Sequence, residues 1–276
     1  MGILEKELEV LQDSTRKAGL EVMRIAADGF ATRRKANQDP VTAADGAANH
    51  ILKDALLGQF PDTGWLSEET VDDLSRLGKG RVWIVDPIDG TKEFIEGIAE
   101  FAVSVALVED GLPIAACVFN PSLGDLYLAA SGRGAWRNNA PIRAEHKLQD
   151  RPIFLASRSE IRRGEFRQFE SPAEVRPCGS IAYKLALVAE GKADATFSLS
   201  PKNEWDIVAG VLLVQEAGGK VSSISVDARQ VQQVSDCTYR QFTFNRRNTL
   251  VDGILAGSVA GYDRALSMIQ ARTRPS

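Results

Sequence analysis

The order of the apolar patterns along the chain limits its fold more than any other feature of the sequence. Apolar residues recur at helical spacing over residues 3–28, which Gly29 would end, and a second helix is predicted from Thr42 to about Gly58. Four short runs rich in β-branched and aromatic residues come next: Arg81–Val85, Phe101–Val108, Ile114–Phe119 and Leu126–Ala129. The turn residues 109–111 predict a hairpin. Because no helix alternates with these runs, the order favours an α+β fold over regular βαβ repetition.

The second half of the chain predicts a closer alternation of strand and helix. Its predicted elements are the strands Ile153–Ala156 and Ala193–Leu199 and the helices Ile181–Glu190 and Asp206–Ala217. A polar stretch over residues 132–151 lies between the halves and predicts a domain boundary near its end. We therefore expect an N-terminal α+β metal-binding subdomain over residues 1–147. A C-terminal α/β subdomain over residues 148–276 would complete the active site.

The composition excludes several classes of protein. Hydrophobic residues make up 44% of the 276 residues and charged residues 25%, as in soluble globular chains and unlike disordered ones. The net charge of -4 disfavours binding to a nucleic-acid polymer, and no run of about 18 apolar residues predicts a membrane span. The N-terminus lacks the pattern of a secretory signal, so the cytoplasm is expected. With two histidines and three cysteines, hydrolytic chemistry would rest on carboxylates and hydroxyls.

The clearest chemical motif is the hexapeptide Asp86-Pro87-Ile88-Asp89-Gly90-Thr91, which directly follows a predicted strand. Two carboxylates three residues apart at a strand end can converge on a hard cation such as Mg²⁺, which prefers oxygen ligands. Gly90 would let the backbone approach a ligand, and a helix beginning at Thr91 would offer N–H groups to a phosphate. Asp-Pro and Asp-Gly are also common turn dipeptides. The spacing argues against an Asp-x-Asp nucleophile that forms an aspartyl-phosphate.

Two other acidic segments are candidates for the same site. Glu68 and Glu69 are adjacent, and neighbouring side chains of an extended segment point in opposite directions, so only one would ligate a metal directly. Asp206 precedes an apolar helix, and it is either the N-cap of that helix or a third carboxylate supplied by the second half of the chain. Either segment alone is also compatible with a solvated acidic loop or a helix cap.

The segment 39–45 carries a fourth candidate. Thr42 and Asp45 have the spacing of a capping box, which would serve only to start a helix. Alternatively, Asp45 lies near Thr91 and polarises its hydroxyl, so that the hydroxyl can take a proton from a water.

Together these segments resemble the inositol monophosphatase superfamily of magnesium-dependent, lithium-sensitive phosphatases. The similar segments cover most of the chain: Asp39–Asp45, Trp65–Thr70, Trp83–Thr91, Gly179–Asp194 and Glu204–Gly219. The resemblance implies the layered αβαβα sugar-phosphatase fold and a homodimer that hydrolyses small phosphate monoesters with a metal-activated water. It implies no nucleic-acid polymer or membrane as partner. A catalytically retired, metabolite-binding member of the superfamily is the alternative of a different class.

The resemblance also implies a role for each matching residue. The metal ligands would be Glu68, Asp86, the backbone carbonyl of Ile88, Asp89 and Asp206. The catalytic residues would be Thr91, Asp45 and Glu69. The pair of Thr91 and Asp45 would help deprotonate the water, and Glu69 would act through waters at a third, weaker metal. The residues expected to bind substrate are Gly90, Thr91, Gly179, Ser180, Lys202 and Asp206. Two or three Mg²⁺ ions per site are expected, with Mn²⁺ as a substitute and Ca²⁺ and Li⁺ as inhibitors.

The substrate is less tightly specified by the sequence. Residues 89–95 and 245–248 resemble the branch of 3'(2'),5'-bisphosphate nucleotidases, which remove the 3'-phosphate of 3'-phosphoadenosine 5'-phosphate. Leu199 stands where inositol-specific members carry a glutamate, whereas residues 196–198 lack the arginine of many nucleotidases. Inositol 1-phosphate or another sugar phosphate therefore remains an alternative. A second phosphate would need a second cation, for which the candidates are Lys184, Lys202, Arg246 and Arg247.

Overall fold

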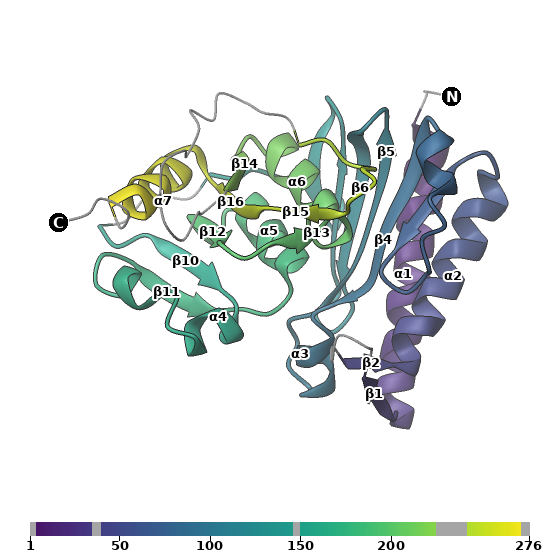
Figure 1. Cartoon of the computed structure of the whole chain (residues 1–276), viewed down its shortest axis with the longest axis horizontal. Helices are drawn as coiled ribbons and strands as arrows, with labels where there is room; N and C mark the ends of the chain where they lie inside the picture. The colour runs from purple at the N-terminus through teal and green to yellow at the C-terminus, as the bar shows by residue number, and fades with distance from the viewer. Residues whose placement is uncertain (1–3, 35–39, 146–149, 225–241, 272–276) are drawn as a thin grey trace.

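The computed structural model describes residues 4–34, 40–145, 150–224 and 242–271, and these form five alternating layers of helix and sheet (Figure 1). A helix pair covers a seven-stranded sheet, a second helix pair separates that sheet from a five-stranded one, and a last helix packs on the far side. This is the α+β architecture predicted from the sequence. None of the described helices is both long and apolar enough to cross a membrane.

The outer helix pair consists of α1 (Glu5–Asp28) and α2 (Ala43–Gln59). Their buried stripes, which include Leu11, Val22 and Leu52, face strands of the seven-stranded sheet. A Cβ atom on Gly19 would lie 2.5 Å from the ring of Phe119, so this glycine lets α1 approach the sheet closely. The two helices therefore form one layer, which fixes the start of α2 against the sheet.

The larger sheet contains seven consecutive strands, β3 to β9, in sequence order. They are β3 (Gly64–Ser67), β4 (Arg81–Asp89), β5 (Ala102–Glu109), β6 (Leu112–Asn120), β7 (Asp125–Ala130), β8 (Gly134–Arg137) and β9 (Ala140–Ile142). The strands β3 and β4 pair in parallel, and every later neighbour pairs antiparallel. Along β4, Val82 and Ile84 face the inner helices, whereas Trp83 and Val85 face the outer pair, so both faces of the sheet are buried.

The strand β4 continues four residues beyond its predicted end at Val85. Its register with β5 shifts between the pairs Asp86–Ser104 and Asp89–Ala102, so β4 carries one extra residue there. The strand β3 ends opposite Val85, and therefore Pro87 needs no hydrogen-bonding partner on that side. The bulge places both aspartates of the motif at the end of the strand.

One predicted connection, the hairpin at residues 109–111, is confirmed, whereas the polar stretch 132–151 contains strands that were not predicted. The hairpin between β5 and β6 is confirmed, and its two turn residues Asp110 and Gly111 have φ of 49° and 83°, as a primed turn requires. The polar stretch 132–151, by contrast, contains β8 and β9 before residue 143, joined at Asn138 and Asn139, which both have positive φ. Residues 146–149 lie outside the described residues, and a division at residue 147 stays a prediction.

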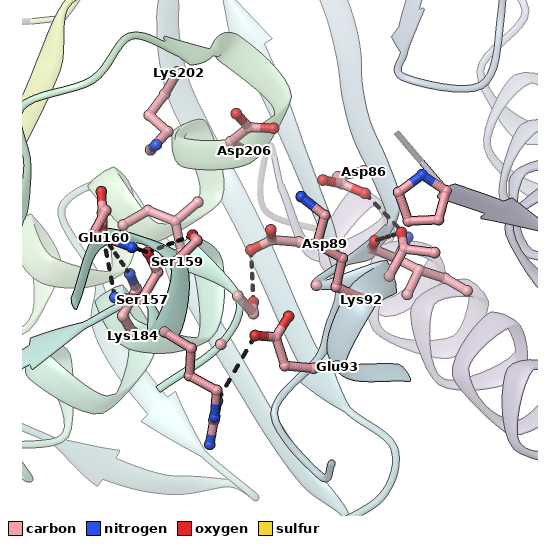
Figure 2. Close-up of a pocket in the computed structure, with 18 of the residues that line it drawn as sticks. Asp86, Asp89, Lys92, Glu93, Ser157, Ser159, Glu160, Lys184, Lys202 and Asp206 are labelled. Atoms are coloured by element: carbon pink, nitrogen blue, oxygen red, sulfur yellow. Dashed lines mark hydrogen bonds and ion pairs between the residues drawn. The ribbon is translucent and has the colours of Figure 1, made fainter. Parts of the chain in front are cut away.

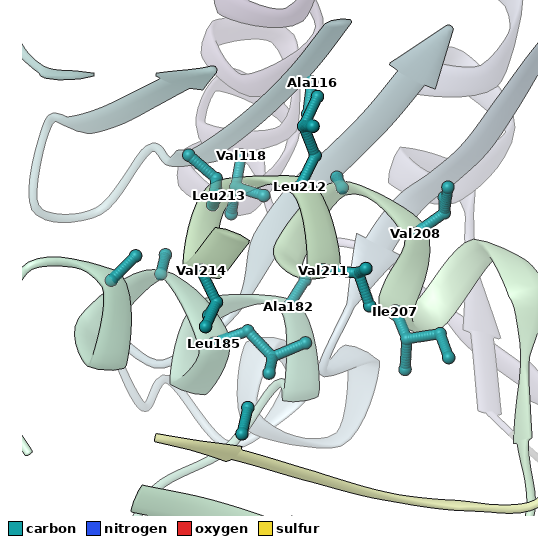
Figure 3. Packing of buried hydrophobic residues seen from close by; sticks show 14 of the residues in the cluster. Ala116, Val118, Ala182, Leu185, Ile207, Val208, Val211, Leu212, Leu213 and Val214 are labelled. Carbon is teal, nitrogen blue, oxygen red and sulfur yellow. The ribbon is translucent and has the colours of Figure 1, made fainter. Parts of the chain in front are cut away.

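The inner helices are α5 (Ile181–Ala189) and α6 (Glu204–Glu216), which bury most of their side chains, some of which Figure 3 shows. A Cβ atom on Gly210 would lie 2.4 Å from Leu185, so the two helix backbones pack closely. The smaller sheet has the order β11-β10-β12-β16-β14. Its strands are β10 (Ile153–Ala156), β11 (Glu174–Pro177), β12 (Ala195–Ser198), β14 (Lys220–Ile224) and β16 (Gly253–Gly257).

Shorter elements complete the fold. The last helix, α7 (Val259–Ala271), packs on the smaller sheet around the buried side chains of Phe154, Phe197 and Tyr262. The remaining elements are β1 (Thr32–Arg34), β2 (Pro40–Thr42), η1 (Ser75–Gly78), α3 (Thr91–Ile95), α4 (Arg158–Arg162), η2 (Arg167–Phe169), β13 (Lys202–Asn203) and β15 (Leu250–Val251). The predicted elements of the second half are confirmed in position, although α6 begins at Glu204, two residues before its predicted start.

Candidate active site

A pocket of about 350 Å³ lies where the end of β4 and the start of α3 meet three segments from the second half of the chain (Figure 2). Most of the predicted site residues line it: Glu68, Asp86, Ile88, Asp89, Gly90, Thr91, Gly179, Ser180, Lys202 and Asp206. Neither Glu69 nor Asp45 is part of the lining, although Asp45 contacts Thr91 directly. Asp39 lies outside the described residues.

Four carboxylates form the acidic end of this pocket. Glu68 lies in the turn after β3, Asp86 and Asp89 lie at the end of β4, and Asp206 lies in the first turn of α6. Burial raises the pKa of Asp86 well above its ordinary range, and repulsion by Glu68 and Asp89 adds to the effect. Burial likewise raises the pKa of Asp89 to about 6 and that of Asp206 to about 8. Without a cation, the three aspartates therefore keep a proton to higher pH than an exposed aspartate does.

Each of the three aspartates is oriented by a donor of the protein. Asp89 Oδ2 accepts hydrogen bonds from Ser180 Oγ and from the backbone N–H of Ala182, both at 2.6 Å. Asp206 Oδ2 accepts from the backbone N–H of Asn203 at 2.8 Å, and Asp86 Oδ1 accepts from that of Ile88 at 3.0 Å. Ser180, predicted to bind substrate, thus positions Asp89. Asn203, not Asp206, is the N-cap of α6, so the sequence-based alternative of an N-cap aspartate is wrong. Asp206 instead completes the capping box with one oxygen, by accepting from the backbone N–H of Asn203.

The donor chemistry of this acidic end fits a hard divalent cation. All its side-chain donors are carboxylate oxygens, which Mg²⁺ prefers over the nitrogen and sulfur that softer metals bind. Across the described ranges, no three acidic, cysteine or histidine side chains form a group that could hold a metal ion as they stand. Each aspartate uses one oxygen for a protein donor, as described above. A cation here would therefore complete its coordination with water and substrate oxygens, as Mg²⁺ commonly does.

Removal of the buried charge of Asp206 should raise the stability of the metal-free protein. The pKa of Asp206, about 8 in the folded protein against an ordinary value of 3.8, favours the protonated folded state, so stability should fall as pH rises from about 4 to 8. We expect Asp206→Asn to raise the metal-free Tm at pH 8 by at least about 3 °C, since ~1 kcal/mol shifts Tm by roughly 2–4 °C in a large domain. At pH 5, near the lower end of that range, the difference should be much smaller than at pH 8.

Differential scanning fluorimetry in chelator at pH 5 and pH 8 measures this effect. The exposed residue Asp62 provides the matched control, because Asp62→Asn removes the same charge outside the pocket. Equal pH dependence of Tm in the wild type and in Asp206→Asn would show that Asp206 carries no raised pKa.

The hydroxyl of Thr91 lies at the edge of the acidic end, next to the start of α2. Its Oγ1 lies 3.2 Å from Asp45 Oδ1 and 3.0 Å from the backbone oxygen of Ile88, so one hydroxyl proton has two acceptors. Asp45 Oδ2 accepts from the backbone N–H and the hydroxyl of Thr42, at 2.8 and 2.7 Å. Both predictions for Asp45 are therefore confirmed: it completes a capping box and it contacts Thr91. Burial raises the pKa of Asp45, which makes it a better proton acceptor at neutral pH.

Gly90 provides the turn between β4 and α3. Its φ is +94°, in the left-handed region that favours glycine, and a Cβ atom there would lie 3.0 Å from the backbone oxygen of Glu100. A side chain at this position would therefore move Thr91 away from Asp45.

Positive and hydroxyl side chains form the opposite side of the pocket. Figure 2 shows Lys184, Ser157 and Ser159 grouped there around Glu160, across from Asp86 and Asp89. Lys184 is 2% exposed, and its Nζ lies 3.9 Å from Glu160 Oε2. Burial lowers the pKa of Lys184, whereas the neighbouring Glu160 opposes that shift.

The structure describes all four basic residues that were candidates to bind a second phosphate. Two of them line the pocket and two do not. Lys184 and Lys202 line the pocket. Arg246 and Arg247 do not, and Arg246 instead pairs with Glu204 at 3.0 Å. Arg158, which sequence reasoning missed, also lines the pocket and forms ion pairs with Glu100 and Glu93.

The segment 157–160 is the part of the pocket that the sequence did not predict. Ser157 and Glu160 form a capping box that begins α4 directly after β10. The spacing Ser-x-x-Glu after a predicted strand was the available signal for the helix start. No sequence pattern indicated that the segment 157–160 lines the pocket, because its position there depends on the packing of β10 beside β12.

Gly179 is held too closely for any side chain. A Cβ atom there would lie 2.4 Å from Glu93 Cγ, and the backbone N–H donates to Glu100 Oε2 at 2.7 Å. Gly179 was predicted to bind substrate, and its N–H group is already engaged by Glu100. Its observed contacts fix the loop that places Ser180 beside Asp89.

Comparison with known proteins identifies the family. Residues 3–259 match the Inositol monophosphatase family, and the chain belongs to it. The 3'(2'),5'-bisphosphate nucleotidase CysQ of Escherichia coli (strain K12) is 38% identical over 214 residues, which are 75% of this chain and 86% of that protein. The Inositol-1-monophosphatase of Rhizobium meliloti (strain 1021) is 35% identical over 224 residues, 77% of this chain and 83% of the relative.

Solved structures share the whole fold. The IMPase of Thermotoga maritima has a TM-score of 0.78 at 25% identity, over 98% of each chain. CysQ of Bacteroides thetaiotaomicron, a bacterial member of the same family, has a TM-score of 0.73 at 27% identity, over 93% of this chain and 98% of that one. The chain thus has the inositol monophosphatase fold and is a phosphoric monoester hydrolase. The named relatives act on small phosphorylated metabolites.

Proposed function

We propose that the protein is a magnesium-dependent 3'(2'),5'-bisphosphate nucleotidase that removes the 3'-phosphate of 3'-phosphoadenosine 5'-phosphate. The observation that carries the proposal is the meeting of Glu68, Asp86, Asp89 and Asp206 in one pocket with the Thr91–Asp45 pair at its edge. A phosphate monoester carries about -1.5 to -2 charges, so a site this acidic needs cations before it can bind one. This requirement also weighs against a retired member that binds metabolites without metal.

The cation would be held by the carboxylates of the acidic end and the backbone carbonyl of Ile88. Bound Mg²⁺ would neutralise charge on phosphate and protein, lower the pKa of a water and stabilise the leaving oxygen. Glu69, outside the pocket lining, would act through waters at a third, weaker site. We further propose that Mn²⁺ substitutes for Mg²⁺, that Ca²⁺ and Li⁺ inhibit, and that the enzyme is a cytoplasmic homodimer.

Thr91 and Asp45 would move the proton of the attacking water. The water gives its proton to Thr91 Oγ1 while the Thr91 hydroxyl gives its own proton to Asp45 Oδ1, 3.2 Å away. The water oxygen then forms its bond to phosphorus as the bond between phosphorus and the sugar oxygen breaks, and solvent protonates the sugar oxygen. The backbone N–H groups of Gly90 and Thr91 would hold the phosphate during this displacement.

The choice of a bisphosphate nucleotide rests on three observations. The nucleotidase CysQ of Escherichia coli is among the similar proteins, at 38% identity. Leu199 packs against the apolar cluster around Phe197 and is absent from the pocket lining, so it offers no polar contact to an inositol ring. Lys184 and Lys202 lie in the same pocket, where they can meet a second phosphate. The similarity to an Inositol-1-monophosphatase at 35% identity supports inositol 1-phosphate as the second candidate.

Phosphate release from the two substrates, compared at equal magnesium, tests the choice. We expect kcat/KM for 3'-phosphoadenosine 5'-phosphate to exceed that for inositol 1-phosphate by at least about 100-fold, because two cations at one extra phosphate give ~3 kcal/mol of selective binding. Adenosine 3'-monophosphate is the matched control, since it lacks only the second phosphate. A preference for inositol 1-phosphate would replace the nucleotide proposal by the second candidate.

A further inference from the structure

A buried network of polar side chains joins the two segments that supply Glu68 and Asp206 to the pocket. Its central members are Arg76, which is 1% exposed, and Glu204, which is 0% exposed. Neither side chain lines the pocket. The network also includes Asn245 and Arg246. Residues 245–248 resemble the nucleotidases in sequence, but the sequence alone did not indicate what these residues do in the structure.

Arg76 fixes the segment that follows Glu68. Its guanidinium donates to both carboxylate oxygens of Asp72, from Nε to Oδ1 at 3.1 Å and from Nη2 to Oδ2 at 2.8 Å. Asp72 lies four residues after Glu68 in the same loop. A Cβ atom on Gly64 would lie 3.0 Å from Arg76 Cβ, so the backbone of η1 packs directly on β3. The loop carrying Glu68 is therefore held at its start by β3 and at its end by Arg76.

The same guanidinium reaches the distant segment 245–246. Arg76 Nη1 donates to Asn245 Oδ1 at 2.6 Å, and Nη2 donates to the backbone oxygen of Arg246 at 2.9 Å. A planar guanidinium with several donors in fixed directions orders its partners more strictly than a lysine ammonium can. One side chain thus joins residues that lie about 170 positions apart.

Glu204 continues the connection to the pocket. It accepts from the backbone N–H groups of Asn245 at 2.6 Å and Arg246 at 3.1 Å, and from Arg246 Nε at 3.0 Å. Glu204 is the first residue of α6, and Asp206 lies in the same helical turn. The position of Asp206 therefore depends on where the segment 245–246 holds the start of the helix.

We propose that Arg76 and Glu204, joined through Asn245 and Arg246, are positioning residues that fix the separation of Glu68 and Asp206 across the pocket. The proposal rests on the proposed function in one respect, which is that Glu68 and Asp206 hold Mg²⁺. A purely structural ion pair would stabilise the fold without affecting magnesium affinity. A positioning network must affect that affinity, because a ligand set that is less well ordered binds a small octahedral cation less tightly.

The test compares Arg76→Lys and Asn245→Gly with the wild type. Arg76→Lys keeps the charge and removes the fork of donors. Asn245→Gly removes only the side-chain amide, which accepts from the Arg76 guanidinium and donates to the Arg76 backbone oxygen. Glycine adopts the left-handed φ of +60° at this position and keeps the N–H that donates to Glu204. Arg137→Lys is the matched control, since Arg137 pairs with Asp125 and Glu190 and does not line the pocket.

Two measurements separate positioning from stability. The magnesium concentration that gives half of the maximal Tm increase, measured with Mg²⁺ alone, should rise about tenfold or more in both variants, as for partners that orient metal ligands. The magnesium concentration for half-maximal hydrolysis should rise in parallel, while substrate KM at saturating magnesium stays within about twofold of the wild-type value. Arg137→Lys should lower Tm without either magnesium shift.

Each outcome decides the proposal. Wild-type magnesium dependence in Asn245→Gly would overturn it, whether or not Arg76→Lys folds. A wild-type protein whose Tm and activity ignore magnesium would overturn both this proposal and the proposed function. A magnesium response in the wild type, together with unchanged variants, would overturn the positioning role alone.

Discussion

The substitution Asp89→Asn should lower kcat about 10²–10³-fold at saturating magnesium while leaving the fold intact. Loss of a ligand to a Lewis-acid metal removes several kcal/mol of transition-state stabilisation, and ~1.4 kcal/mol corresponds to tenfold in rate. The fold should persist because Ser180 Oγ and the N–H of Ala182 both donate to the same oxygen, Oδ2. The amide oxygen of asparagine can accept both bonds. Steady-state phosphate release measures the loss, and circular dichroism checks the fold.

The control for Asp89→Asn is Asp252→Asn, which removes a charge from an exposed position of the second half outside the pocket lining. That variant should keep wild-type kcat. Wild-type turnover by Asp89→Asn at saturating magnesium would remove Asp89 from the ligand set, and the two-metal proposal with it.

The second large effect is expected for Thr91→Ala, which should lower kcat about 100-fold or more. In the proposed mechanism the hydroxyl of Thr91 passes the proton of the water to Asp45, 3.2 Å away, and general acid–base catalysis typically contributes ~10²–10⁴-fold. Thr91→Ser keeps the hydroxyl and its two acceptors, Asp45 and the carbonyl of Ile88, so it should retain most of the activity. Single-turnover phosphate release at saturating substrate reports the chemical step directly.

The comparison of Thr91→Ser with Thr91→Ala tests the hydroxyl group alone. Both substitutions remove the methyl group of Thr91, so a difference between them isolates the hydroxyl. If Thr91→Ala turned over as fast as Thr91→Ser, the proton would leave the water by another route, and the pair of Thr91 and Asp45 would serve only to hold the start of α3 against α2.

Features that depend on neighbouring residues were predictable from the sequence. The capping box of Thr42 and Asp45, the hairpin at residues 110–111 and the helix end at Gly29 each follow from the preferences of a few adjacent residues, and the structure confirms them. The contact of Asp45 with Thr91 was proposed only as an alternative to capping. The structure shows that the two are compatible, because each carboxylate oxygen faces a different partner.

Features that depend on distant segments could not be predicted. The strand was predicted to end at Val85, directly before the turn dipeptide Asp86-Pro87. In the structure β3 stops opposite Val85 and the bulge accommodates the proline, so β4 continues to Asp89. The helix α6 begins before Asp206 because Asn203 caps it. Asn203 also ends the short strand β13, which pairs with β15, so that Asn203 lies opposite Leu250, 47 residues further along the chain.

The contacts between side chains in the pocket also depend on distant segments and could not be predicted. Ser180 was predicted to bind substrate because the segment 179–194 resembles the family. In the structure its hydroxyl donates to Asp89, which lies 91 positions away. Arg158 has no recognisable signal of its own, and it enters the pocket only because β10 is placed beside β11 and β12. Residue types and local spacing therefore predict which chemistry is present, whereas the partner of each group depends on tertiary packing.

If Asp45 accepts the proton as proposed, its double use makes the reaction depend on the integrity of one helical turn. One of its oxygens closes the first turn of α2 and the other faces Thr91, so fraying of that turn would withdraw the proton acceptor while every other group stayed in place. Helix ends open locally at much lower free energy than the whole fold unfolds. On warming, activity would therefore disappear reversibly at temperatures below those at which the protein melts.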